Sequence, residues 1–415
     1  MSEELTPLPL PVRMMNIAGN GLGKLGITPI SLSEDKLLRA AEKETGLSDF
    51  GDDSFRAPLA RLLSSIEHEA QLNLMGRMVA RTDLLRLLKG RLQIIDTFKQ
   101  HPEIRDEEIQ RPMIVVGAPR TGTTVFHDLL AMDSDNRVPL SWETSMPCPP
   151  PEAATFKTDP RIAQVQADLD QVDKLVPDFK KMHPMGAERA QECVAFTSYQ
   201  FTSMIFDVQY RVPSYEEWVN TADVSDMFTF HREFLQMLQW KAPGARWALK
   251  SPQHLWHLKP LLEQYPDALI VQTHRDPVRV LVSIASLIAA LRRLSSDKVD
   301  LHDIASHYAK WLATAYKHTM DVRDSGLLPE SQVVDLQFSD FVQGQVGCVR
   351  RAYEHFGLSL KDSSATAMQQ FIDDNPADKH GKHMYRFKDT GLDLDEIREL
   401  YKPYSSYFDI ALEDV

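Results

Sequence analysis

Apolar residues recur at three- and four-residue steps in the first quarter of the chain. Two sets follow this spacing: Leu37, Leu38 and Ala41, then Leu59, Leu62, Leu63 and Ile66. A repeat close to 3.6 residues is typical of helices with one buried face. We therefore expect at least two helices between residues 31 and 100, within an N-terminal helical region that covers residues 1–110.

After Pro112 the pattern changes to short, uninterrupted apolar runs. Four runs have the length of strands, at residues 113–116, 246–250, 268–273 and 332–336. Runs of this kind are typical of parallel strands that are covered on both faces. Because these strands alternate with helices, residues 111–415 are expected to form an α/β core with a mainly parallel sheet. Ligands of such sheets bind at the carboxyl ends of the strands.

A long segment with helical periodicity separates the first two of these strands. It starts with a proline-rich loop at residues 147–160 and continues as helices from Arg161 to about Gln239. We expect a helical insertion into the core at about residues 147–240. Near the start of the chain, Gly21-Leu-Gly-Lys-Leu-Gly26 matches a dinucleotide fingerprint, but no convincing strand precedes it and Pro29 follows. We interpret that stretch as a flexible, glycine-rich segment.

Charge and composition exclude several classes of protein. The 415 residues carry a formal net charge of -13, which argues against a general nucleic-acid binder, although a local pocket could still bind a small anion. Three distant cysteines favour a reducing compartment. The apolar run at residues 280–291 is too short to span a bilayer and is flanked by arginines. We expect a cytoplasmic protein that is not integral to the membrane, with that run as a buried helix.

The turn after the first expected strand has the glycines of a phosphate-binding loop. It reads Val115-Val-Gly-Ala-Pro-Arg-Thr-Gly-Thr-Thr124, with Gly117 and Gly122 at the spacing of that loop. Thr123 stands at the position of its lysine. A kinase or ATPase needs that lysine and a magnesium ion to neutralise a polyphosphate. A sulfonate carries less charge, so its transfer is less demanding.

Other groups in this loop can bind an anion. Backbone N–H groups and the start of the following helix converge there. Arg120 supplies a planar cation that can engage two oxygens of a phosphate or sulfonate together. Three hydroxyls and one glycine N–H complete the expected ligand set: Thr121, Gly122, Thr123 and Thr124.

A second anion site is indicated by Thr273-His-Arg-Asp-Pro-Val-Arg-Val-Leu-Val-Ser283. Asp276 can cap a helix whose first residue is Pro277. Arg275 would then lie at the end of a strand, and Ser283 about two turns into the helix. These positions predict a second phosphate site beside the glycine-containing loop.

Together the two motifs resemble those of sulfotransferases that use 3′-phosphoadenosine 5′-phosphosulfate. Pro119-Arg-Thr-Gly-Thr-Thr124 matches the family loop that binds the 5′-phosphosulfate, and Arg275 with Ser283 matches the motif that binds the 3′-phosphate. The wider pattern is most similar to a bacterial branch, from about residue 30 onward. Its further matches are Trp142-Glu143, Glu192-Cys193, Lys250-Ser-Pro-Gln-His254 and His383-Met-Tyr385.

The resemblance implies an enzyme that moves a sulfonate from this nucleotide to an acceptor hydroxyl or amine. It also implies that Lys382 and His383 lie near the 3′-phosphate. Cytosolic steroid and phenol sulfotransferases have lysine at the position of Arg120, so their substrates do not carry over. Two alternatives remain open: a small-molecule kinase of the phosphate-loop type, and a nucleotide-binding regulator without catalytic activity.

Three residues are candidates for the base that deprotonates the acceptor. The resemblance favours Glu192, and tyrosine-sulfating relatives use a glutamate that would correspond to Glu143. His254 would lie in a helix start at the carboxyl end of a strand, and a histidine needs no tuning to act near neutral pH. His254 and His257 have no third ligand at sensible spacing, so we expect no metal.

The acceptor is expected to be a small apolar or aromatic molecule, including a lipid-like one. The helical insertion carries the aromatic side chains that we expect to line its pocket: Phe196, Tyr199, Phe201, Phe206 and Tyr210.

Overall fold

A five-stranded parallel sheet lies at the centre of the protein. The computed structural model describes residues 8–25, 29–175, 185–376 and 386–414. The strands are ordered β2-β3-β1-β4-β5, and every neighbouring pair is parallel. Their bounds are Met113–Gly117 for β1, Asn136–Arg137 for β2, Arg246–Lys250 for β3, Leu269–His274 for β4 and Val333–Gln337 for β5.

The sheet confirms the predicted α/β class. Each of the four predicted strands is present with its ends displaced by no more than one residue. Strand β2 was not predicted, because two residues are too few to show a periodicity.

Both faces of the sheet are covered by apolar side chains. Ile114 and Val116 belong to a core cluster that includes the N-terminal helices. Met113 and Val115 point the other way, into a cluster with helices α5 (Thr123–Ala131) and α17 (Gln345–His355). Because alternate residues of a strand face opposite sides, a sheet buried on both sides requires an uninterrupted apolar run.

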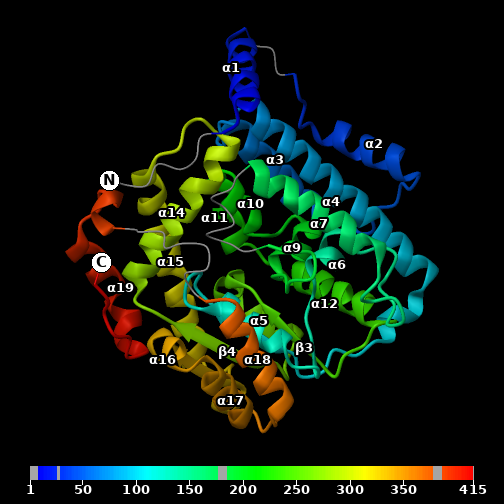
Figure 1. Cartoon of the computed structure of the whole chain (residues 1–415). Coiled ribbons are helices and arrows are strands. Elements are labelled where there is room, and N and C mark those ends of the chain that lie inside the picture. The colour runs from blue at the N-terminus through cyan, green and yellow to red at the C-terminus, as the bar shows by residue number, and fades with distance from the viewer. Residues whose placement is uncertain (1–7, 26–28, 176–184, 377–385, 415) are drawn as a thin grey trace.

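The N-terminal region is helical, as predicted. Its main elements are α2 (Glu34–Thr45), α3 (Arg56–His68) and α4 (Leu74–Gln100), which lie along one side of the sheet (Figure 1). A Cβ at Gly90 of α4 would lie 2.3 Å from the ring of Tyr199, so this glycine allows the helix to approach the insertion closely. The residues of these helices and of the sheet share one core cluster.

The structure corrects the interpretation of the glycine-rich N-terminal stretch. Residues Leu10–Lys24 form helix α1, which projects beyond the other helices (Figure 1). The helix rests on the start of α4, where Asn16 Oδ1 accepts a hydrogen bond from the Met75 N–H at 3.0 Å. Gly19 faces Leu74 so closely that a Cβ would lie 2.5 Å from the Leu74 Cβ. Tertiary packing outweighs the low helix propensity of glycine here.

The predicted helical insertion is present as a series of helices. They are α6 (Ser141–Ser145), α7 (Pro160–Leu175), α9 (Val194–Thr197), α10 (Ile205–Gln209), α11 (Pro213–Thr221) and α12 (Ser225–Gln239). The five aromatic residues expected to line a pocket are at most 2% exposed and belong to the main core cluster. Tyr199 stacks on Phe234 at 5.9 Å between ring centroids, and Phe201 packs on Phe206 at 6.3 Å. The structure places these rings in the packed core instead of on the wall of an open pocket.

The remaining helices complete the two layers around the sheet. One group packs together on one side: α13 (Leu258–Gln264), α14 (Pro277–Ser295), α15 (Leu301–Asp324) and α19 (Leu394–Tyr407). Helices α16 (Phe338–Gln343) and α18 (Asp362–Asp374) accompany α17 on the other (Figure 1). The apolar run at residues 280–291 lies in α14, which is largely buried as predicted. Among the described residues, no helix combines the length and apolar character that crossing a membrane requires.

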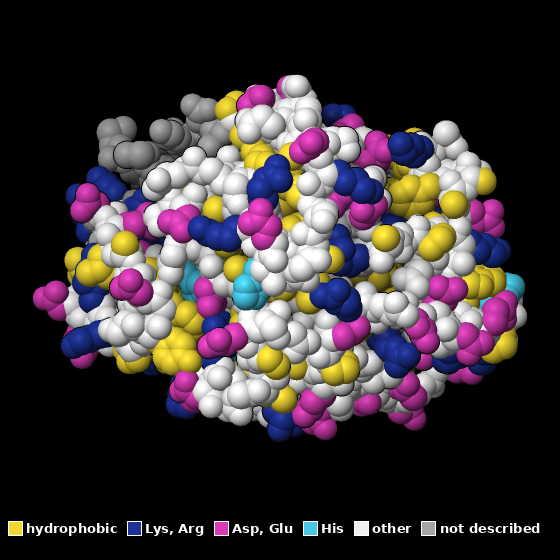
Figure 2. Space-filling view, turned by 90° about the horizontal axis from the view of Figure 1, so that it is seen from below, with side chains coloured by type: hydrophobic (Ala, Val, Ile, Leu, Met, Phe, Trp, Pro, Cys, Tyr) yellow, Lys and Arg dark blue, Asp and Glu magenta, His cyan; other side chains and the backbone are white. Residues whose placement is uncertain are grey.

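The surface carries charges of both signs. On the face shown in Figure 2, lysine and arginine side chains are interspersed with aspartate and glutamate side chains. No extended basic surface is visible on that face, which agrees with the net charge of -13. Any strong attraction for an anion there must come from a local group of residues.

Candidate active site

The loop between β1 and α5 has the backbone geometry of an anion-binding turn. Gly122 caps α5 with φ 91°, in the left-handed region that favours glycine. A Cβ at Gly117 would lie 2.1 Å from the Thr273 hydroxyl oxygen, so only glycine lets the loop approach β4. Arg120 has φ 73°, which is costly for a residue with a side chain and is found mostly at functional positions.

The three loop threonines have different surroundings. Thr121 is buried, and its hydroxyl donates to the Ala118 carbonyl at 2.7 Å and lies 2.6 Å from the Thr273 hydroxyl. That hydroxyl therefore holds the loop against β4. Thr123 is buried at the start of α5, whereas Thr124 is half-buried and its hydroxyl accepts a hydrogen bond from Lys250 Nζ at 3.4 Å.

The structure brings the two predicted anion sites together. Arg120 Nε donates to the Ser283 hydroxyl at 3.0 Å, across 163 residues of sequence. Arg275 Nη1 donates to the Arg120 carbonyl at 3.0 Å. Two guanidinium groups and a helix hydroxyl thus converge beside the start of α5. The carboxyl ends of β1 and β4 position them, because these strands are neighbours in the sheet.

Arg275 already binds a carboxylate in the structure. Its Nε and Nη2 atoms lie 2.8 and 2.9 Å from the two carboxylate oxygens of Glu413, a bidentate geometry that a phosphate can also offer. The guanidinium carbon lies 4.0 Å from the centre of the Phe338 ring. The Glu413 N–H donates to Asp276 Oδ2 at 2.8 Å, which fixes the end of the chain there. Glu413 was not predicted as part of the site, because it lies outside both motifs.

Glu192 faces the loop through an ion pair with Lys250. Lys250 is the last residue of β3; its side chain is 2% exposed and donates to Glu192 Oε1 as well as to Thr124. The Cys193 N–H donates to the Lys250 carbonyl at 2.9 Å, so the backbone also joins the two segments. Glu192, at 18% exposure, is within reach of solvent. The sequence showed Lys250 only as part of a motif, and its contact with Glu192 was not predicted.

Glu143, the second candidate base, lies in a different environment. Its side chain is fully buried and forms a two-pronged ion pair with Arg137, with Arg137 Nη1 2.9 Å from Oε2. Oε2 also accepts a hydrogen bond from the Leu140 N–H at 3.0 Å, which caps α6. Both carboxylate oxygens are therefore engaged by protein donors. The structure thus turns the Glu143 carboxylate toward protein donors, and its role as the base stays a prediction.

His254, the third candidate, lies in the short 3-10 helix η4 (Pro252–Trp256) after β3. Its side chain is 1% exposed. Burial, with the neighbouring His231 and His257, lowers the pKa of His254 well below its ordinary value. The imidazole of His254 is therefore enclosed by protein in this structure, and its role as the base stays a prediction. The remaining two predicted ligands, Lys382 and His383, lie outside the described residues.

The arrangement is suited to binding a nucleotide with two separate phosphate groups. Three cations, Arg120, Lys250 and Arg275, lie around the carboxyl ends of three adjacent strands. The amino ends of α5 and α14 add partial positive charge at the same edge. Glu192 is the carboxylate that joins this group from the insertion. Such a site can neutralise phosphates and place one base beside them.

Comparison with known proteins agrees with this geometry. The model of the sulfotransferase family matches residues 112–362, a span that contains both anion motifs. A curated relative from Mycobacterium bovis, omega-hydroxy-beta-dihydromenaquinone-9 sulfotransferase Stf3, is 25% identical over 271 residues, which cover 64% of this chain and 67% of the relative.

Two solved structures are similar over most of the chain. Sulfotransferase STF1 from Mycobacterium tuberculosis is 31% identical, with a TM-score of 0.80, and the match covers 89% of this chain and 98% of that one. Sulfotransferase STF9 from Mycobacterium avium is 26% identical, with a TM-score of 0.85 and coverage of 94% and 100%. These likenesses include the N-terminal helical region as well as the sheet.

Proposed function

The chain belongs to the sulfotransferase family and is a sulfotransferase, and from this premise we propose that its donor is 3′-phosphoadenosine 5′-phosphosulfate. We propose further that its acceptor is an apolar, lipid-like molecule with a hydroxyl or amine. Family membership confirms the activity expected from the two motifs and counts against the kinase and the silent regulator.

The convergence of Arg120, Arg275 and Ser283 is the observation that carries the choice of donor. The nucleotide has a 5′-phosphosulfate and a separate 3′-phosphate, and a guanidinium group suits each of them. We assign Arg120, Gly122, Thr123 and Thr124 to the 5′ group, together with the start of α5. Thr121 supports this loop from behind. Arg275 and Ser283 are assigned to the 3′-phosphate, with Lys382 and His383 as further ligands by resemblance.

The proposed reaction is an in-line transfer. Glu192 takes the proton of the acceptor hydroxyl or amine, whose oxygen or nitrogen forms a bond to sulfur while the bond between sulfur and the 5′-phosphate oxygen breaks. Arg120 and the loop N–H groups stabilise the charge that develops on the departing phosphate. Lys250 orients the Glu192 carboxylate and links it to Thr124 of the loop.

The proposed acceptor class has support from the chain and from a relative. Stf3 is named for a menaquinone derivative with a hydroxyl group. In this chain Glu192 lies on the helical insertion, at the junction with β3. We propose that the acceptor reaches the sulfur atom along the insertion, beside Glu192.

The donor assignment predicts that nucleotide binding depends on the 3′-phosphate and needs no magnesium. Adenosine 3′,5′-bisphosphate should bind at least about tenfold more tightly than adenosine 5′-monophosphate, because it gains the charge-assisted contacts with Arg275. Isothermal titration of both nucleotides in the presence of a chelator measures this. Equal affinities, or a strict requirement for the metal, would contradict the proposal.

Replacing Arg120 or Arg275 with alanine should have different effects on nucleotide binding and on kcat. Arg275→Ala should mainly weaken nucleotide binding, because the 3′-phosphate does not change its charge during transfer. Arg120→Ala should mainly lower kcat, because its contact strengthens as the 5′-phosphate departs. Steady-state kinetics with a hydroxylated quinone, combined with nucleotide titration, separates the two effects. Identical losses in both parameters for both variants would argue against separate roles.

A further inference from the structure

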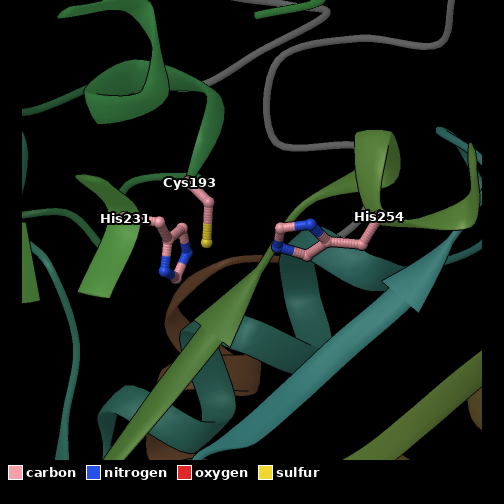
Figure 3. Close-up of side chains that lie close together, drawn as sticks. All are labelled: Cys193, His231 and His254. Carbon is pink, nitrogen blue, oxygen red and sulfur yellow. The ribbon is translucent and has the colours of Figure 1, made fainter. Parts of the chain in front are cut away.

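Three side chains with metal-binding atoms meet in the core beside the active site. They are Cys193 before α9, His231 on α12 and His254 in η4, and all three are buried. One donor atom from each lies within 4.8 Å of the other two. Figure 3 shows the Cys193 sulfur between the two imidazole rings. The three residues come from segments that are far apart in sequence, so only the folded chain creates this cluster.

Three of the four imidazole nitrogens of this cluster have no hydrogen-bond partner in the part of the chain that the structure describes. Both ring nitrogens of His254 and the Nε2 atom of His231 are buried without a hydrogen bond among the residues that the structure describes. Buried polar atoms are almost always satisfied, so several orphaned nitrogens at one place indicate a missing ligand. His231 Nδ1 lies 2.7 Å from the Tyr265 hydroxyl, a contact that turns Nε2 toward the cluster. Metal-binding histidines commonly have such a partner on their second nitrogen.

We propose that Cys193, His231 and His254 bind a divalent metal ion of the zinc type. Thiolate sulfur and imidazole nitrogen are donor types that zinc binds in proteins. Zinc holds nitrogen and sulfur donors at about 2.0–2.3 Å, so donors within 4.8 Å of one another need only small rotations to share one ion. The sequence predicted no metal, because the spacing of residues reveals only ligands that are close together in the chain. Ligands that the fold brings together from distant segments leave no such pattern.

A second group of ionisable residues lacks these properties. Asp207, Glu216 and His307 also lie within 4.8 Å of one another. Asp207 pairs with Arg292 at 3.0 Å and accepts a hydrogen bond from Tyr308, and Glu216 pairs with His307. These partners compete with a metal for the same oxygen atoms. Among the described residues, no ion pair competes with a metal for the donor atoms of Cys193, His231 or His254.

The proposed ion would join the two segments that carry the catalytic ion pair. Cys193 directly follows Glu192, and its N–H donates to the Lys250 carbonyl at 2.9 Å. His254 lies four residues beyond Lys250. A metal bound here would hold the insertion against the end of β3. Because all three of its ligands are buried and come from separate segments, the bound ion would stabilise this junction. The link between the ion and catalysis rests on the role proposed for Glu192, whereas the metal site itself does not.

Cobalt(II) provides a direct test, since it replaces zinc and absorbs light when bound to a thiolate. Titrating cobalt chloride into the full-length protein, after removal of bound metal with a chelator, should give a sulfur-to-cobalt charge-transfer band that saturates at one ion per chain. Cys193→Ser should abolish the band. The matched control Cys348→Ser, which removes another buried cysteine, should retain it. A second variant, His231→Asn, should weaken cobalt binding at least about tenfold.

Two results would overturn the metal site. Saturation far below one ion per chain is the first, and a band that persists in Cys193→Ser is the second. Should Cys193→Ser fail to fold, an unchanged affinity in His231→Asn would serve as the contradicting result. The titration contains neither nucleotide nor acceptor, so its outcome is separate from that of the sulfonate-transfer assays.

Discussion

Two glutamates of this protein each form an ion pair close to the active site, and only one of the pairs reaches it. Glu143 pairs with Arg137, and Glu192 pairs with Lys250. The two segments are neighbours, because the Gln191 N–H donates to the Pro139 carbonyl at 2.7 Å. Yet the Glu143 side chain is fully buried, whereas that of Glu192 is 18% exposed and its lysine contacts the phosphate-binding loop.

The difference shows that an ion pair takes its role from its surroundings. Arg137 presents two donors to Glu143 and also donates to the Ala242 and Val138 carbonyls, so the pair ties several backbone segments together. Lys250 has a point charge that Glu192 and Thr124 share. The first pair therefore joins buried backbone segments, while the second holds a partly exposed carboxylate beside the loop between β1 and α5.

The largest effect is expected from breaking the buried pair. Glu143→Gln should lower the free energy of unfolding by about 3–5 kcal/mol, because it leaves the Arg137 charge buried without a counter-charge. Urea denaturation measures the loss. Glu152→Gln is the matched control, since Glu152 pairs with Lys241 at the surface and such pairs contribute no more than about 1 kcal/mol. Equal losses in the two variants would mean that burial does not distinguish them.

The pair at the active site should instead affect turnover. Glu192→Gln should lower kcat roughly 100-fold or more, in line with typical general-base contributions. Its affinity for adenosine 3′,5′-bisphosphate should stay near that of the wild type. Glu188→Gln changes an exposed glutamate four residues earlier in the chain and should leave both quantities unaltered. If Glu192→Gln turns over normally, the base lies elsewhere and Glu192 only orients the acceptor.

The smallest effect concerns the third carboxylate, Glu413, which occupies Arg275. The 3′-phosphate that we propose for Arg275 would replace Glu413, so Glu413→Gln should tighten nucleotide binding by a few-fold, corresponding to roughly 1 kcal/mol or less for a partly exposed pair. Titration of adenosine 3′,5′-bisphosphate measures the change. Glu399→Gln alters an exposed glutamate on α19 and should have no effect. Weaker binding in Glu413→Gln would show that this carboxylate helps to position Arg275 for the nucleotide.

Local sequence patterns were sufficient to predict the α/β class, four of the strands and the two anion motifs. Periodicity and turn residues depend on a few neighbouring positions. They can therefore be interpreted without knowledge of the tertiary contacts. The same local information placed Arg120 after β1 and Arg275 after β4. It could not choose among three candidate bases, since each candidate has the right chemistry and a plausible position at the end of an element.

Which of those candidates contacts the loop between β1 and α5 depends on tertiary packing. The partners of Glu143, Glu192 and His254 are set by how distant segments pack, and packing determines both burial and the number of competing donors. The same reason explains the glycine-rich helix α1 and the aromatic rings that belong to the core. Cys193 and His231 meet His254 because α12 and η4 pack together, a contact that no spacing in the sequence encodes.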